Sequence, residues 1–175
     1  MTAHDAKRLQ EAEGSPPGID WNAVYADQLP RVYNYFRFRA ARSHDVEELT
    51  ARTFEKAWRA RAKYRRDLAG FSTWLFAIAR NVMTDQLRAD ALRTRAATWS
   101  EPIEQVTPEG NAMHGSDMER LATLTAGLAD RHKELIALKY GAALSNRMIA
   151  RVTGLSESNV GTTLQRTVER LRARW

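Results

Sequence analysis

One stretch, FSTWLFAIARNVMTDQLR (71–88), restricts the possible folds of this chain more than any other. Plotted on a helical wheel at about 100° per residue, its apolar side chains cover more than half of the circumference. The remaining arc is polar, and Trp74, Asn81 and Arg88 follow one another along it at seven-residue spacing. The pattern predicts a helix that is buried on most sides in a bundle and exposes one narrow strip.

Two further helices are predicted before this stretch. Apolar residues recur at helical spacing over 21–36, where Pro30 marks the expected place of a kink. Asp45 is followed three residues later by Glu48, which resembles a capping box, so the second helix is expected to begin there. No part of the chain alternates between polar and apolar residues for long enough to predict a strand. The fold class is therefore predicted to be all-α.

Turns and one long interruption divide the chain into two helical blocks. A basic, turn-prone segment (63–70) precedes the stretch quoted above, for which Ser72 is the expected N-cap. From about residue 95 to residue 116 the helical pattern stops, and Pro and Gly interrupt a polar segment that is predicted to be a flexible linker. Helices are predicted again over 117–128 and 130–140.

The C-terminal part of the chain has the pattern of a helix-turn-helix. After Gly141, which is expected to end the preceding helix, Ser145 is predicted to cap a short helix and Ser156 a longer one. The turn between them, Thr153-Gly154-Leu155, needs the conformational freedom of glycine. Short polar side chains followed by arginines suit a reader of the DNA major groove, although a plain helical hairpin would share part of this pattern. The outward-facing residues are Ser158, Asn159, Thr162, Thr163, Arg166 and Arg170.

The net charge of +6 is unevenly distributed. Residues 1–18 carry a net charge of −1, residues 19–98 of +6, residues 99–118 of −4 and residues 119–175 of +5. Two basic blocks joined by an acidic segment indicate two units that bind a polyanion, with a different role for the segment between them. Two solvated surfaces would give the same charges.

Composition disfavours several kinds of site. The chain has no cysteine, which excludes disulfides and thiolate-bound metals. No metal or other cofactor is expected, because its histidines lie too far apart in sequence to form a local ligand pair. They are His4, His44, His114 and His132. No apolar run approaches the roughly 18 residues of a membrane span, and no export signal stands at the N-terminus, so we expect a cytoplasmic protein without membrane insertion.

These patterns together resemble an extracytoplasmic-function (ECF) sigma factor of bacterial RNA polymerase. The resemblance rests on DVEELTARTFEKAW (45–58), on the stretch 71–88 with its specific core WLFAIARN, on the acidic segment, and on the helix-turn-helix block. It covers roughly residues 20–173, with both blocks in the family's order. The implied organisation is a tail (1–18), a region-two-like domain (19–95), a linker (96–116) and a region-four-like helix-turn-helix domain (117–175).

The resemblance implies three functional surfaces. In the family, the helix that matches 45–60 binds the clamp helices of the largest polymerase subunit, the part that matches 63–88 holds the melted strand of the minus-ten element, and the last helix reads the minus-thirty-five duplex. The first surface would comprise Glu47, Glu48, Arg52, Glu55, Lys56 and Arg59. The second would comprise Lys63, Tyr64, Arg65, Arg66, Trp74, Arg80, Asn81 and Arg88. The third is the outward-facing set of the helix-turn-helix.

The implied partners are core RNA polymerase, through its largest and second-largest subunits, promoter DNA, and an anti-sigma factor. Two of the implied contacts keep a structural alternative. The acidic residues near position 45 are also favourable charges at a helix N-terminus, and Trp74 could equally be a core aromatic. Single-strand binding needs cationic groups and flat surfaces, which the second surface combines.

Three places depart from the family pattern. Ala51 and Arg52 stand where Gln-Glu is common, Met148 stands where Glu is usual, and Gly161 replaces a usual Lys or Arg. The last change removes an expected DNA contact and weakens the helix by roughly 1 kcal/mol relative to alanine.

Two other functions are weighed against this interpretation. A stand-alone helix-turn-helix regulator would need a ligand pocket or a self-complementary apolar surface, and residues 19–95 show neither pattern. A helix-turn-helix recombinase or nuclease would need a nucleophile or a carboxylate cluster, and the acidic residues of the first block fall at helix starts instead. The sequence therefore favours a non-enzymatic initiation factor.

Overall fold

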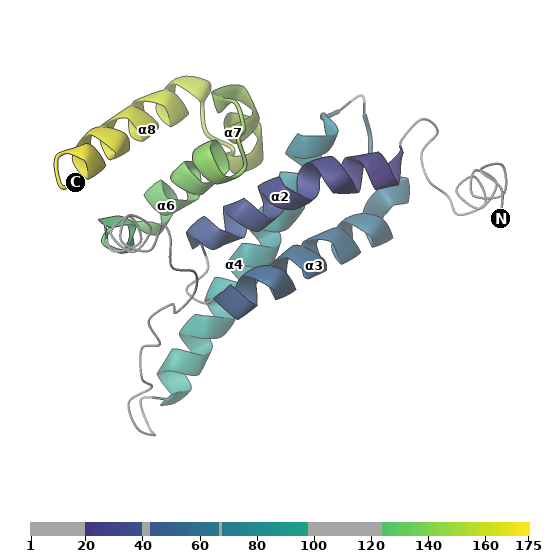
Figure 1. Ribbon diagram of the computed structural model, residues 1–175, viewed down its shortest axis with the longest axis horizontal. Helices are drawn as coiled ribbons and strands as arrows, with labels where there is room; N and C mark the ends of the chain where they lie inside the picture. Colours follow the sequence, from purple (N-terminus) through teal and green to yellow (C-terminus); the bar gives the residue numbers. More distant parts are fainter. Residues whose placement is uncertain (1–19, 40–42, 67, 98–123) are drawn as a thin grey trace, which may run out of the picture.

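The computed structural model describes residues 20–39, 43–66, 68–97 and 124–175, and its regular elements in these ranges are all helical (Figure 1). The all-α class is confirmed. The first unit consists of α2 (Trp21–Arg39), α3 (Ser43–Ala60), the single turn η1 (Arg61–Lys63) and α4 (Phe71–Ala97). The second unit consists of α6 (Asp130–Ile136), η2 (Ala137–Gly141), α7 (Asn146–Thr153) and α8 (Glu157–Arg172). Among the described helices, none has the length and apolarity needed to cross a membrane.

The first helix begins at a side-chain cap. The Asp20 carboxylate accepts hydrogen bonds from the backbone N–H groups of Asn22 (3.0 Å) and Ala23 (3.1 Å), which have no partner within the helix. The helix continues across Pro30. Its inner face buries Val32, Tyr35 and Phe36 completely.

The second helix begins earlier than the sequence predicts. α3 starts at Ser43, so Asp45 lies inside the first turn and the predicted capping box with Glu48 is wrong. The carboxylate of Asp45 is still favourable there, because the first turn carries the positive end of the helix dipole. The inner face of α3 buries Val46, Leu49, Thr53 and Ala57.

The long helix α4 also begins before its expected cap. Its first turn is closed by the Trp74 N–H, which donates to the Gly70 carbonyl at 3.1 Å. Ser72 is therefore not the N-cap, and its hydroxyl instead accepts a hydrogen bond from Arg31 Nη1 at 3.3 Å. The helix runs for 27 residues to Ala97, beyond the predicted 71–88. Its buried side is the one that the wheel predicts, with Leu75, Phe76, Ala79, Val82 and Met83 almost inaccessible.

The helix-turn-helix is confirmed in detail. The Ser145 hydroxyl accepts a hydrogen bond from the N–H of Met148, and the Ser156 hydroxyl accepts one from the N–H of Asn159, each at 3.2 Å. Gly154 has a φ of 75°, a conformation that glycine adopts without strain. The predicted linker and the predicted helix over 117–128 lie mostly outside the described residues.

The helix before the helix-turn-helix has a last turn that the sequence does not predict. It ends at Gly141, as predicted, but its last turn, η2, widens into a π-helix in which the Ala142 N–H donates to the Ala137 carbonyl at 2.9 Å. The widened turn seats Gly141 against α2, where a Cβ atom would come within 3.0 Å of the Asn34 carbonyl oxygen and of the Phe38 ring. The glycine is needed for this close approach.

The two units share one core. Buried apolar side chains from α2, α3 and α4 and from α6 to α8 belong to a single contiguous cluster. Figure 1 shows the second unit lying beside α2 and the upper part of α4, with the C-terminal half of α4 extending away from the body. The two helical units therefore contact each other through buried side chains, in addition to being connected by the chain.

Candidate polymerase and nucleic-acid interfaces

The outer face of α3 is a surface of paired charges. The six residues of the predicted polymerase-binding set all lie at least partly exposed on it. Exposed pairs of this kind contribute at most about 1 kcal/mol each, so the fold does not depend on them and the charges remain available to a partner. The pairs are Glu48–Arg52 at 3.7 Å, Glu55–Arg59 at 2.6 Å and Lys56 with Asp85 of α4 at 3.5 Å.

The basic loop after η1 exposes cations but not its tyrosine. Lys63, Arg65 and Arg66 are exposed, whereas Tyr64 is 6% exposed and its hydroxyl donates to the Ala69 carbonyl at 3.1 Å. Burial raises the pKa of the Tyr64 phenol, and the nearby Arg66 charge partly offsets this. The prediction that Tyr64 offers its ring to a base does not fit this position, because the side chain supports the loop from inside.

An aromatic cluster lies beneath this loop. Trp21 and Trp74 pack against Phe71 with ring centroids 5.5 and 5.4 Å apart, and Tyr64 lies 5.0 Å from Trp74. Trp74 is therefore largely a packing residue, the alternative that the sequence had left open. Trp58 is 42% exposed at the edge of the cluster, 5.7 Å from Trp21, and the Arg61 guanidinium lies over one face of its ring, 4.0 Å from the centroid.

Sequence reasoning had not placed Trp21 or Trp58 near the loop. Their meeting depends on how α2 packs across α3, which the periodicity of either helix alone does not show. With Tyr25, Phe54 and Phe71 they line an open pocket of about 250 Å³.

The polar strip of α4 is exposed beyond its aromatic end. Asn81 and Arg88 are both exposed, and Asp85 lies between them, 3.9 Å from Arg88 Nη1. The strip therefore offers an amide and a guanidinium to a ligand, while Trp74 anchors it to the core.

Arg80 does not join this strip. Its Nε donates to Glu134 of α6 at 2.8 Å, and only 35% of the Arg80 side chain and 15% of the Glu134 side chain are exposed. Arg80, one of the predicted strand-binding residues, is thus paired with a carboxylate of the second unit.

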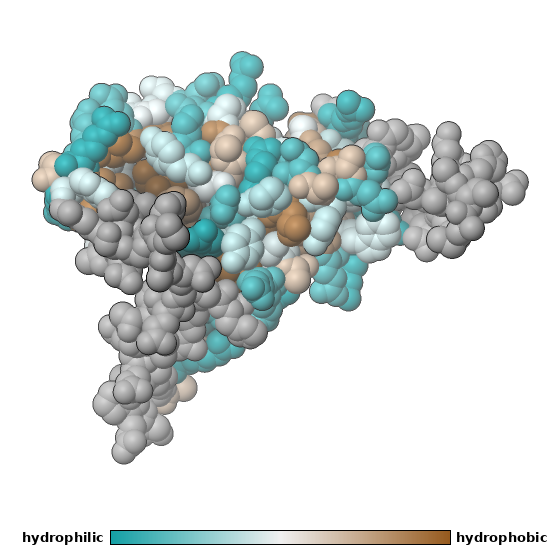
Figure 2. Space-filling view, viewed as in Figure 1, coloured by the Kyte–Doolittle hydropathy of each residue, from teal (hydrophilic) through white to brown (hydrophobic). Residues whose placement is uncertain are grey.

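The outer face of α8 carries the predicted DNA-reading residues. Ser158, Asn159, Thr162, Arg166 and Arg170 are exposed and Thr163 is half-buried, where its hydroxyl donates to the Asn159 side-chain oxygen at 3.0 Å. In Figure 2 the outer edge of this helix, at the upper left, is hydrophilic. The structure brings the whole set together on one helix.

Gly161 lies at the edge of this surface. A Cβ atom there would lie 3.5 Å from the Asn146 amide nitrogen of α7, an ordinary contact. The position that departs from the family pattern therefore faces the neighbouring helix.

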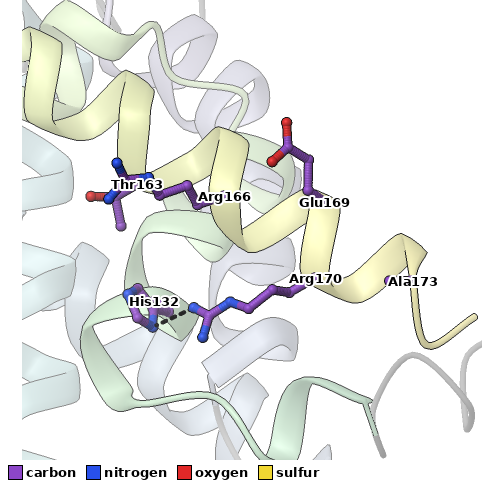
Figure 3. A pocket seen from close by; sticks show the side chains of 6 residues that line it. All are labelled: His132, Thr163, Arg166, Glu169, Arg170 and Ala173. Carbon is purple, nitrogen blue, oxygen red and sulfur yellow. Dashed lines mark hydrogen bonds between the residues drawn. The ribbon is translucent and has the colours of Figure 1, made fainter.

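A cationic pocket lies between α8 and α6 (Figure 3). Arg170 Nη2 lies 3.5 Å from His132 Nδ1, while Glu169 points away from the imidazole and accepts a hydrogen bond from Gln165 at 3.0 Å. Among the described residues, neither Arg166 nor Arg170 pairs with a carboxylate. Two unneutralised guanidinium groups beside an imidazole suit a phosphate group. His132 was missed by sequence reasoning, because it belongs to another helix.

Comparison with known proteins gives the same division of the chain. The sigma-70 region 2 family model matches residues 24–93, and the sigma-70 region 4 family model matches residues 118–171. The ECF RNA polymerase sigma factor BldN of Streptomyces coelicolor is 26% identical over 85% of this chain, which spans 57% of BldN. ShbA of Streptomyces griseus, another ECF sigma factor, is 28% identical over 82% of this chain and 81% of its own length.

Solved structures agree with the fold. The sigma factor RpoE of Bartonella quintana, in complex with the anti-sigma factor NepR, superposes with a TM-score of 0.73 over 88% of this chain and 95% of its own, at 22% identity. CnrH, in complex with the cytosolic domain of CnrY, gives a TM-score of 0.58 over 86% of this chain and 82% of its own, at 25% identity. Matches to both sigma regions in order, with ECF relatives that span both, lead to one conclusion: this chain belongs to the ECF sigma factors of bacterial RNA polymerase.

Proposed function

We propose that this chain binds core RNA polymerase through α3, holds the melted minus-ten strand on the loop 63–66 and the strip of α4, and reads the minus-thirty-five duplex through α8. It thereby directs promoter-specific initiation. The observation that carries the proposal is the presence, on one chain and in the family's order, of a charged helix face, a cationic loop over aromatic rings, and a helix-turn-helix with a basic outer face.

The minus-ten surface has the chemistry that single-stranded DNA needs. Lys63, Arg65 and Arg66 supply cations for the phosphates, the half-exposed Trp58 ring with the Arg61 guanidinium over it supplies a flat cationic surface, and Asn81 supplies an amide. Tyr64 acts as the support of this surface and not as a stacking group.

The duplex-reading surface separates two tasks. Short polar side chains near the start of α8 can approach base edges, and the arginines further along can hold phosphates. We include His132 in the phosphate contacts, because it faces Arg170 across the cationic pocket.

The same function determines partners and location. The chain carries out no reaction of its own and works in the cytoplasm, where polymerase and promoter meet. The neighbouring structures of RpoE and CnrH contain NepR and CnrY respectively, which supports an anti-sigma factor as a further partner of this chain.

The proposal is tested by reconstitution with core polymerase on a library of genomic fragments, with run-off transcripts mapped by sequencing. Defined new start sites should appear only when the chain is added. If the transcripts are the same with and without the chain, it does not direct initiation, and the proposal is wrong. A stand-alone helix-turn-helix regulator would instead bind DNA without binding core polymerase, so co-elution with the core enzyme separates the two functions.

Exchanging Glu48 and Arg52 (Glu48→Arg with Arg52→Glu) should weaken core binding roughly tenfold, equivalent to about 1.4 kcal/mol. The exchange keeps a charge pair on the helix but reverses the charges offered to polymerase, so helicity by circular dichroism should not change. The same exchange at Asp90 and Arg93 of α4 is the matched control. Equal affinities of all three proteins in a titration against core polymerase would rule out this face.

Arg166→Ala should weaken binding to a minus-thirty-five duplex and reduce the slope of log affinity against log salt concentration by about 1. The reason is that one fewer phosphate contact releases fewer counterions. Arg59→Ala, on the far unit, should leave the slope unchanged. A loss of affinity at constant slope would mean that Arg166 reads a base or supports the fold.

A further inference from the structure

A carboxylate lies in the middle of the polar strip of α4. Asp85 follows Asn81 by four residues and precedes Arg88 by three, so the three side chains leave the same side of the helix. All three are exposed. A surface that binds a nucleic-acid backbone is normally cationic, because every phosphate carries a negative charge. An exposed anion at the centre of such a surface therefore needs a reason.

The structural role of Asp85 is small. Its ion pair with Lys56 joins α4 to α3 at 3.5 Å, but both side chains are about half exposed to solvent. Such a pair contributes at most about 1 kcal/mol. The two helices are held together instead by buried apolar side chains, among them Leu49 of α3 and Val82 of α4. The fold therefore does not require a carboxylate at this position.

The neighbours of Asp85 offset its charge and leave its oxygens accessible. Lys56 Nζ lies 3.5 Å from Oδ2, and Arg88 Nη1 lies 3.9 Å from Oδ1. Both distances exceed the roughly 2.7–2.9 Å of a charge-assisted hydrogen bond. A carboxylate has about four lone-pair sites, so these two long contacts leave acceptor positions on both oxygens. The two cations also keep the local charge positive, which allows a phosphate backbone to pass nearby.

The spacing along α4 matches an unstacked strand. Asn81 and Asp85 are separated by about 6 Å along the helix axis, which is more than the roughly 3.4 Å between stacked bases. Bases of a melted strand are splayed apart and can adopt the wider spacing. A carboxylate repels phosphates, so the group that Asp85 can bind is a base. Asn81 and Asp85 can thus each face one of two neighbouring bases.

The chemistry of a carboxylate selects among the four bases. Its two oxygens only accept hydrogen bonds. The pairing edge of unpaired guanine presents two adjacent donors, N1–H and the N2 amino group. Adenine and cytosine present one donor beside an acceptor, and thymine presents one donor between two acceptors. With any base except guanine, one carboxylate oxygen would lack a donor or face an acceptor, which costs binding free energy.

We propose that Asp85 determines promoter specificity by binding an unpaired guanine of the melted minus-ten strand through N1–H and the N2 amino group. Asn81 contacts the neighbouring base, and Arg88 contacts the backbone beside it. This inference rests on the proposed function, because it requires that the strip of α4 faces single-stranded DNA. It adds the identity of one base and the residue that reads it.

The test is a selection from a randomised pool of single-stranded DNA by core polymerase assembled with the full chain. Guanine should be enriched at one position with the native chain. With Asp85→Asn that position should change from guanine to adenine, because an amide offers one donor and one acceptor, as adenine does. Asp90→Asn is the matched control, since Asp90 is a half-exposed, ion-paired carboxylate on the same helix. It should keep the guanine.

A change in the DNA tests the same contact from the other side. Hypoxanthine in place of the selected guanine lacks only the N2 amino group. The complex with the native chain should bind this strand about tenfold more weakly, which corresponds to about 1.4 kcal/mol. The complex with Asp85→Ala should bind both strands equally. Each comparison uses one protein, so a change in overall affinity or folding of the variant does not affect it.

Three results would overturn the inference. Asp85→Asn could still select guanine, or the native complex could bind guanine and hypoxanthine equally. Asp85→Asn could also raise the affinity for all four bases by the same factor, which would mean that the carboxylate only repels the backbone. If the complex binds no single strand at all, the proposed function of the strip fails as well. Binding without a base preference at Asp85 contradicts this inference alone.

Discussion

Phe76→Ala is expected to lower the free energy of unfolding by about 3–5 kcal/mol, the largest effect of any single change considered. The ring is completely buried in the middle of α4, packs edge-on against Tyr35 at 5.9 Å, and lies under the Arg31 guanidinium at 5.9 Å. Its removal leaves a cavity beside Arg31, the residue that links the first unit to the second.

Urea unfolding followed by circular dichroism measures this loss. Leu92→Ala on the same helix, where the side chain is 65% exposed, should cost little and is the control. The midpoint of Phe76→Ala should fall without a second transition, since one core joins both units. Two separate transitions would show that the units unfold independently, and a small loss would show that the core refills the cavity.

Asn81→Ala should impair promoter opening more than closed-complex binding. A hydrogen bond from the Asn81 amide contributes roughly 0.5–1.5 kcal/mol net, and the DNA stacking that opposes opening averages about 1.4 kcal/mol per step. Loss of one strand contact can therefore reduce a nearly balanced opening step by about tenfold. Asn81 is exposed, so its truncation leaves no cavity to confuse the result, unlike Trp74, which packs among three other rings.

Promoter opening is measured by the permanganate reactivity of unpaired thymines. The assay uses a duplex promoter and a promoter with a pre-melted bubble. The variant should fail on the duplex and largely recover on the bubble, while Asn34→Ala, an exposed asparagine on α2, should behave like the native chain. Equal loss on both templates would mean that Asn81 holds the strand after opening. Native reactivity on both would mean that the strip is solvated surface only.

The parts of the fold that local chemistry determines could be predicted from the sequence. The caps at Ser145 and Ser156 and the left-handed Gly154 depend on neighbours within four residues, and the structure has each of them. The buried side of α4 followed from periodicity alone. By contrast, the expected caps at Asp45 and Ser72 were wrong: α3 begins at Ser43 and α4 at Phe71, so both residues lie inside the first turns of their helices.

The remainder depends on contacts between distant residues. Three features depend on residues from separate elements: Tyr64 lies inward, Trp21 contacts Trp58, and His132 approaches Arg170. The sequence around each of these residues does not predict the contact. Arg80 is the clearest case. The family resemblance placed it among the strand-binding residues, but only the packing of the second unit shows that it pairs with Glu134.

The place where α4 ends sets a limit on promoter geometry. Ala97 and residue 124 are joined by 27 peptide steps, which reach at most about 90–97 Å when fully stretched. A random coil of that length would average only about 30 Å. Elements named for positions ten and thirty-five lie some 25 base pairs apart, or roughly 85 Å at 3.4 Å per base pair. This distance lies within the covalent reach but far above the coil average, so lengthening the spacer should weaken promoter use more than shortening it by the same number of base pairs.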